Sequence, residues 1–317
     1  MKITILNLRI QISAIIAVFI LSANSGFAQN YNSSDNYKLV WEDSFNGNKI
    51  NTKNWQIISD GNSGGGNQEL QYYHQKNIKV GKEPVSGESC LIITAKKQDY
   101  LSKKATSGKI TTQNKISFKY GKIEARIKLP KTGNGLWPAF WLLGTNYPQI
   151  PWPTCGEIDI VEMGSKAGIE TGVQNRHFTG ACHWGASYND GKYPNYGKPT
   201  ISLYSLQEDF HLYTLIWDKD LVKMYLDQDK YPNCEPYYAM QINGDNVPNN
   251  PDNPANFFHK QYFIIFNIAV GGTFPQITDI NKVTALKNGE AKMYIDFVRV
   301  YQKKTAEEEF TSVASTK

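Results

Sequence analysis

The chain has 317 residues and a formal net charge of +5, and 13% of its residues are aromatic. Lysine and arginine are spread along the sequence, and so mild a charge gives no support to nucleic-acid binding. A chain of this length can bury a sizeable core as one domain, and its many aromatic residues are typical of β-sheet packing.

The first 28 residues have the organisation of a secretory signal peptide. Lys2 and Arg9 form a basic start, the apolar run ISAIIAVFILSA follows, and Gly26 and Ala28 supply the small residues of a cleavage site. The apolar run is short for a membrane span. We therefore predict cleavage after Ala28, release into a periplasm or the medium, and no membrane association afterwards.

Residues 29–302 are predicted to form one all-β domain. Short alternating runs such as KISFKYGKIEARIKLP, FHLYTLIW, LVKMYLD and MYIDFVRVY recur, and Gly-, Asn- and Pro-rich turns separate them. This organisation predicts a β-jelly roll, a sandwich of two antiparallel sheets. Residues 303–317 are predicted to form a polar C-terminal tail.

Two of these strands show which side chains share a face. In YGKIEARIKLP, residues 120–130, charged side chains occupy alternate positions from Lys122 to Lys128 and apolar ones lie between them. In LWPAFWLLG, residues 136–144, Trp137, Ala139 and Trp141 share one face, and apolar residues fill the other. Two indoles that flank a small alanine suit a flat sugar ring, although core packing is the commoner role of a tryptophan pair. Because both faces of this strand are apolar, either the second sheet or a bound ligand must cover one of them.

The stretch GEIDIVEMG, residues 156–164, places Glu157, Asp159 and Glu162 among residues that favour burial. On a regular strand Glu157 and Asp159 share a face and Glu162 points to the other. One extra residue corrects this parity, so we predict a β-bulge at Ile160–Val161. A solvated strand face or a calcium site are the alternatives, but the β-branched residues between the acids argue against both.

Glycoside hydrolysis fits such a carboxylate group. It needs one ionised and one protonated carboxyl group across the scissile bond, and like charges held close together push their pKa values apart. Four cysteines, Cys90, Cys155, Cys182 and Cys234, have no zinc or redox spacing, and both disulfides and free thiols remain open.

The acidic strand resembles the E-x-D-x-x-E signature of glycoside hydrolase family 16. KLVWEDSFNG, GNQELQYY, SGKITTQNKISFKYGKIEARIKLP, GLWPAFWLLG, WPTCGEIDIVEMGS, FHLYTLIWD and FNIAVGG are similar, in order, to motifs of its laminarinase, or β-1,3-glucanase, branch. The resemblance implies a jelly roll with a concave substrate cleft and a retaining mechanism. It implies that Glu157 is the nucleophile, Glu162 the general acid/base and Asp159 the assisting carboxylate.

The same resemblance implies further site residues. Those expected to bind substrate are Asn67, Glu69, Arg126, Trp137, Trp141, Trp152, His183 and Trp184. Glu69 and Arg126 are alternatively a pair, and His183 is alternatively a structural histidine. Glu42 and Asp296 match positions around a structural calcium ion, and no cofactor is expected for catalysis.

The resemblance therefore predicts a secreted, monomeric endo-β-1,3-glucanase that acts on β-glucan polysaccharide. A mixed-linkage β-1,3-1,4-glucanase is the nearest alternative. A galactan hydrolase, a transglycosylase and a non-catalytic carbohydrate-binding jelly roll are weaker alternatives, the last because all three carboxylates are present.

Overall fold

The computed structural model describes residues 36–61, 67–188, 191–244, 247 and 249–313. The predicted signal peptide and its cleavage site lie outside the described residues. No helix in the described part of the chain is both long enough and apolar enough to span a membrane.

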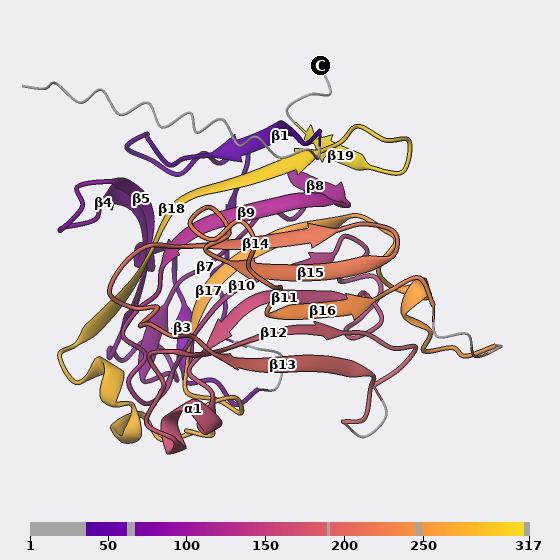
Figure 1. Ribbon diagram of the computed structural model, residues 1–317. Helices are drawn as coiled ribbons and strands as arrows, with labels where there is room; N and C mark the ends of the chain where they lie inside the picture. The colour runs from indigo at the N-terminus through magenta and orange to yellow at the C-terminus, as the bar shows by residue number, and fades with distance from the viewer. Residues whose placement is uncertain (1–35, 62–66, 189–190, 245–246, 248, 314–317) are drawn as a thin grey trace, which may run out of the picture. The chain divides into compact units, whose positions relative to one another are not determined.

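Two large sheets, A and B, dominate the described chain (Figure 1). Sheet A has the strand order β16-β15-β14-β9-β18-β5-β6-β3, with β1 added on β18 and β4 on β5. Its strands are β1 (Lys38–Asp43), β3 (Gln71–Tyr73), β4 (Ile78–Lys82), β5 (Ser89–Lys96), β6 (Ala105–Ser107), β9 (Gly121–Lys128), β14 (His211–Trp217), β15 (Leu221–Leu226), β16 (Tyr238–Gln241) and β18 (Glu290–Gln302).

Sheet B has the strand order β13-β12-β11-β10-β17-β7-β2, with β8 paired to β17 and β19 to β8. Its strands are β2 (Gln56–Ile57), β7 (Lys109–Thr111), β8 (Ile116–Lys119), β10 (Leu136–Gly144), β11 (Glu157–Met163), β12 (His177–His183), β13 (Asn195–Ile201), β17 (Tyr262–Val270) and β19 (Glu309–Ser312). The described helices are short: α1 (Lys166–Glu170) and the 3-10 turns Gln75–Asn77, Pro254–Asn256, Ile280–Lys282 and Thr284–Leu286.

The inner faces of both sheets form one hydrophobic core. Ile123 and Ile127 of β9 and Phe140 and Leu142 of β10 are fully buried in the same cluster. Their alternation agrees with the pattern predicted from the sequence, in which every second residue of each strand is apolar. Nearly all pairings are antiparallel, as in β9 with β14 and β10 with β17. The predicted all-β sandwich is therefore confirmed.

Part of the predicted polar tail belongs to the sheet. Strand β19 pairs antiparallel with β8, and Phe310 packs against the core. The four cysteines are free, and Cys234 is the one that is not fully buried. The sequence left both disulfides and free thiols open, and in the structure the thiols are free.

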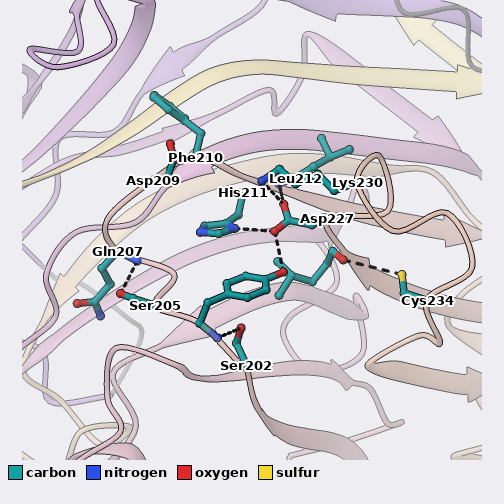
Figure 2. Close-up of polar contacts among 12 residues, drawn as sticks. Ser202, Ser205, Gln207, Asp209, Phe210, His211, Leu212, Asp227, Lys230 and Cys234 are labelled. Atoms are coloured by element: carbon teal, nitrogen blue, oxygen red, sulfur yellow. Dashed lines mark hydrogen bonds and ion pairs between the residues drawn. The ribbon is translucent and has the colours of Figure 1, made fainter.

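A buried polar network joins the end of β15 to the start of β14 (Figure 2). The carboxylate of Asp227, which is 1% exposed, lies 2.7 Å from Nδ1 of His211 and accepts hydrogen bonds from the Tyr204 hydroxyl and the Leu212 N–H. Burial raises the pKa of Asp227, but these donors outweigh it and the pKa is lowered overall. The ionised carboxylate therefore stabilises the fold.

Replacing Asp227 with Asn tests this network. Residue 227 has φ of 51°, a conformation that Asn also tolerates, so the change removes charge with little backbone strain. We expect a loss of about 3–5 kcal/mol of unfolding free energy at pH 7, measured by urea denaturation.

The pH dependence of this loss provides the control. The pKa of Asp227 is lower in the folded protein than in the unfolded chain, where an aspartate has a pKa of about 3.9. Its ionised carboxylate therefore stabilises the folded state above about pH 3.9, and this stabilisation is lost as the pH falls through the pKa of the folded state. The difference in unfolding free energy between wild type and Asp227→Asn should therefore become smaller below about pH 4. A difference that stays constant down to pH 2 would contradict the role given to the carboxylate charge.

Candidate active site

The acidic strand β11 lies between β10 and β12 in sheet B, and a glycine stands at each of its ends (Figure 1). Gly156 has φ of 74° and Gly164 has φ of 97°. A Cβ atom at residue 164 would lie 1.9 Å from the Leu136 carbonyl oxygen, and one at residue 156 would lie 2.1 Å from the Tyr262 hydroxyl. Only glycine fits both positions, so these residues fix where the strand enters and leaves the sheet.

The register of β11 shifts within the strand, as predicted. Asp159 faces Ala181 of β12 and Glu162 faces Thr179, so Ile160 and Val161 together oppose one residue. Both Ile160 and Val161 are fully buried in the core between the sheets. Because the bulge sends two consecutive side chains inward, the next residue returns to the outer face of sheet B.

Glu157, Asp159 and Glu162 consequently share that outer face. Asp159 is 3% exposed, and its charge raises the pKa of the neighbouring Glu157. Nε2 of His183 lies 3.2 Å from Oδ2 of Asp159. The indole N–H of Trp137 donates to Oε1 of Glu162 at 2.8 Å. The three carboxyl groups therefore form one acidic site.

Burial raises the pKa values of all three carboxyl groups, and the charge of a neighbouring carboxylate adds to the rise for Glu157 and Asp159. For Glu157 desolvation is the main cause and the charge of Asp159 adds to it, while His183 opposes the rise. For Asp159 the causes are desolvation and the charge of Glu162. For Glu162 desolvation raises the pKa, and His183 and the Trp137 hydrogen bond oppose it. Ionising all three together is costly, so the site retains protons into the range where ordinary carboxyl groups have lost them.

Among the described residues, one group of side chains has the spacing of metal ligands, and it lies within the acidic site. The ligand atoms of Glu157, Asp159 and His183 lie within 4.8 Å of one another. These are the same atoms that form the acidic site, so a metal ion here would compete with its protons.

The predicted tryptophans lie on β10, beside the acidic strand, and each has a defined partner. The Trp137 ring stacks on Phe274 with centroids 4.9 Å apart. The Trp141 indole N–H donates to Oδ1 of Asn267 at 2.7 Å, and the Lys109 ammonium lies 4.9 Å from the Trp141 ring centroid. These contacts hold both indoles on the outer face of sheet B, next to the carboxyl groups.

Asn67 and Glu69 lie at the Trp137 end of this face. Glu69 is 6% exposed, and its carboxylate accepts hydrogen bonds from Gln71 and, at 3.4 Å, from the Tyr73 hydroxyl. A Cβ atom on Gly272 would contact both Glu69 and Trp137. Glu69 therefore belongs to the predicted group, but its oxygens are already engaged by protein donors.

Trp152 and His183 lie on the other side of the acidic strand, with ring centroids 6.2 Å apart. His183 faces Glu157 across the β11–β12 pair. Tyr193 joins them, 4.6 Å from Trp152 and 5.7 Å from His183 between centroids. Burial and then the charge of Glu157 raise the pKa of Tyr193 to about 12, which agrees with its place beside the acids.

Two predicted substrate-binding residues lie elsewhere. Trp184 follows His183, so alternation turns its ring into the core, where it donates to the Asp252 carbonyl at 2.8 Å. Arg126 belongs to β9 of sheet A and points away from the core that Ala125 and Ile127 fill. Its guanidinium contacts Glu88 and, at 2.7 Å, Asp296, and not Glu69. The structure therefore does not bring either residue into the acidic site.

The carboxylates of the two residues predicted around a calcium ion both face arginine side chains. The Asp296 carboxylate is engaged by Arg126, and the Glu42 carboxylate lies 3.2 Å from Nε of Arg299. A guanidinium on each carboxylate neutralises the charge that would attract a cation. A calcium ion bound by Asp296 and a backbone oxygen of the opening strand stays a prediction.

Sequence reasoning missed Lys109, Asn267 and Tyr193. Lys109 faces Asn267 across the β7–β17 pair, and burial lowers its pKa. Both stand inside motifs that the sequence analysis quoted, SGKITTQ and FNIAVGG, so strand alternation within those motifs could have identified them. Tyr193 lies in a turn-rich loop, where no periodicity assigns a direction.

Comparison with known proteins agrees with this geometry. Residues 67–255 match the sequence model of the family described as glycosyl hydrolases family 16. Among curated relatives, the clotting factor G alpha subunit of Tachypleus tridentatus is 34% identical over 269 residues, 84% of this chain and 34% of that protein. Glucan endo-1,3-beta-glucosidase A1 of Niallia circulans is 32% identical over 278 residues, 83% of this chain and 38% of that protein.

A solved structure is also similar. It is a family 16 protein for mixed-linkage glucan from Bacteroides ovatus in complex with product, with 38% sequence identity and a TM-score of 0.70. The alignment covers 83% of this chain and 100% of that one. The two curated relatives are longer proteins, and the chain spans only about a third of their length, 34% of one and 38% of the other.

Replacing Asp159 with Asn tests the electrostatic coupling of the site. The variant removes the neighbouring charge that raises the pKa of Glu157, so we expect the Glu157 titration to move to lower pH. Carbon-13 NMR of glutamate-labelled protein measures this directly. Glu83, whose carboxylate accepts hydrogen bonds from the 85–86 turn in the other sheet, is the internal reference. A Glu157 titration that stays in place or moves to higher pH would contradict the coupling.

Proposed function

The chain belongs to glycosyl hydrolase family 16, and from this premise we propose that it is an endo-acting β-glucanase that cleaves internal β-1,3 linkages with retention of configuration. The observation that carries the proposal is the bulge in β11, which places Glu157, Asp159 and Glu162 on one face of sheet B. A retaining glycosidase needs two carboxyl groups on opposite sides of the scissile bond.

In this proposal Glu157 is the nucleophile and Glu162 the general acid/base. A Glu157 oxygen attacks the anomeric carbon while the bond from that carbon to the leaving oxygen breaks, and Glu162 gives its proton to that oxygen. Glu162 then removes a proton from water, the resulting hydroxide attacks the anomeric carbon, and Glu157 leaves. The sugar keeps its configuration because two inversions occur.

The contacts of each carboxyl group support these roles. The charge of Asp159 raises the pKa of Glu157, so a proton on Asp159 allows Glu157 to be ionised. Burial raises the pKa of Glu162 and so favours a protonated acid. The Trp137 N–H occupies Oε1 of Glu162, which leaves Oε2 as the oxygen that carries the transferable proton.

The choice of β-1,3-glucan follows from motifs of the laminarinase branch and from the relative in Niallia circulans that is named a glucan endo-1,3-beta-glucosidase. Mixed-linkage glucan is the second candidate substrate, because the Bacteroides ovatus structure named for that polysaccharide is 38% identical. The N-terminal segment with the organisation of a signal peptide supports export of the enzyme.

A substrate panel tests the proposal. Reducing sugar is measured in parallel on laminarin, lichenan, agarose and carrageenan, followed by linkage analysis of the oligosaccharides released. We expect the highest rate on laminarin and products joined by β-1,3 bonds. Faster release from lichenan would favour the mixed-linkage alternative, and hydrolysis of agarose or carrageenan alone would overturn the assignment to glucan.

Replacing Glu157 with Ala removes the nucleophile. We expect kcat on laminarin to fall at least about a thousandfold, while binding of laminarin, measured by calorimetry, persists. Added azide should restore turnover and give the α-configured glycosyl azide, because a small anion attacks from the side that the carboxylate has vacated. Glu290→Ala, which changes a carboxylate on β18 of the other sheet, is the control. Retained activity in Glu157→Ala would exclude the nucleophile role.

Replacing Trp137 with Phe keeps an aromatic ring against Phe274 but removes the N–H that lowers the pKa of Glu162. The pKa of Glu162 should therefore rise, and because this group must be protonated, the alkaline limb of kcat/KM should move up by as much as about one pH unit.

Trp141→Phe is the matched control for this shift. Its indole N–H donates to Asn267 and not to a carboxylate, so the alkaline limb should keep its position. An alkaline limb that moves down in Trp137→Phe, or moves equally in both variants, would contradict the assignment of Glu162 as the acid.

A further inference from the structure

Four aromatic rings gather on the β12 side of the acidic strand. We call Trp152, His183, Tyr188 and Tyr193 the ring cluster. Trp152 lies 5.5 Å from Tyr188 and 4.6 Å from Tyr193 between centroids, and the two tyrosine rings are stacked 5.7 Å apart with 30° between their planes. The cluster joins the loop before β11 to the loop between β12 and β13.

The cluster begins at the carboxyl groups and extends away from them. His183 is in direct contact with Asp159, at 3.2 Å, and Tyr193 lies next to His183. Tyr188 lies beyond Tyr193 and is 56% exposed. The rings therefore form a continuous aromatic path from the acidic site into solvent.

The opposite side of the acidic strand has different chemistry. There the Trp141 indole N–H donates to Asn267 and the Lys109 ammonium lies over the Trp141 ring, so these three residues form a polar network in place of exposed rings. A glucan that crosses the strands of sheet B would pass from this network, over the carboxyl groups, to the ring cluster. Exposed rings bind sugar faces without directional bonds, which suits the part of the chain that must leave after cleavage.

We propose that Tyr188 and Tyr193, together with Trp152, form a stacking platform for the leaving-group part of a β-linked glucan chain. The inference rests on the proposed function, and it adds two residues to the substrate site. The apolar C–H faces of glucose units lie against the exposed rings, and the platform thereby selects oligosaccharides that extend at least two units beyond the scissile bond.

The exposure of Tyr188 separates this role from simple packing between loops. Aromatic residues that hold the fold together here are almost fully buried, as Trp55 and Trp217 are at 1% and 0% exposure. Tyr188, in contrast, leaves more than half of its surface open at the outer end of the ring cluster. Removing its ring should therefore affect the binding of long substrates more than it affects the fold.

The experiment uses the full-length protein and laminarihexaose labelled at its reducing end. Wild type is compared with Tyr188→Ala, Tyr188→Phe and Tyr231→Ala, whose target is a tyrosine of matched exposure, 54%, in the turn after β15. KM, kcat, the frequency of cleavage at each bond, and the melting temperature are measured for each protein.

We expect Tyr188→Ala to raise KM about three- to tenfold with a much smaller change in kcat, the range expected for one aromatic contact. Cleavage should move toward the labelled end, because fewer sugars are then held on the leaving-group side. Tyr188→Phe should behave as wild type, since it keeps the ring, and Tyr231→Ala should change neither KM nor the cleavage pattern.

Each other outcome has a distinct meaning. If wild type cleaves the hexaose but Tyr188→Ala shows an unchanged cleavage pattern, or lowers the melting temperature without changing KM, the platform is overturned while the glucanase function stands. A cleavage shift toward the unlabelled end would likewise overturn it, because the rings would then hold the other part of the chain. If wild type hydrolyses no β-glucan, the proposed function itself fails.

Discussion

The acidic site depends on the burial of two consecutive side chains of strand β11, Ile160 and Val161. Both side chains are fully buried, so the core takes two consecutive residues of the strand where a regular strand supplies one. This burial returns Glu162 to the face that carries Glu157 and Asp159. Burying two large apolar side chains is worth several kcal/mol, on the order of 1.5–3 each, and this energy opposes a return to regular register.

The acidic site works against the stability of the fold that holds it. Three carboxyl groups are desolvated on one face, and burial is the main cause of the raised pKa in each. Partial compensation comes from His183, from the Trp137 N–H and from the charge of Lys109 near Glu157. Such a site resists full ionisation, and that resistance is what an acid catalyst requires.

The two sheets divide stability and chemistry between them. In sheet A, ionisable residues are paired: Asp227 with His211, Arg126 with Glu88 and Asp296, and Lys128 with Glu83. In sheet B, the outer face carries like charges side by side together with partly exposed rings. The pKa values of Asp227 and Glu83 are lowered, so ionisation of these two groups favours the folded state near neutral pH, and this stability is available to offset the repulsion within the acidic site.

The sequence by itself determined the sandwich, the alternation of β9 and β10, and the need for an extra residue between Asp159 and Glu162, because strand alternation follows from local backbone geometry. The sequence did not determine which sheet each strand joins, and so it could not place an outward-facing residue relative to the carboxyl groups. Arg126 has the right alternation for an outer face, but β9 belongs to sheet A, so that face lies away from the carboxyl groups.

Only the tertiary structure decided the partners of Trp184, Asp296, Lys109 and Tyr193, since their contacts come from segments distant in sequence. The alternation of residues along a strand specifies to which face each side chain points. The contacts between strands and loops depend on how the whole chain packs.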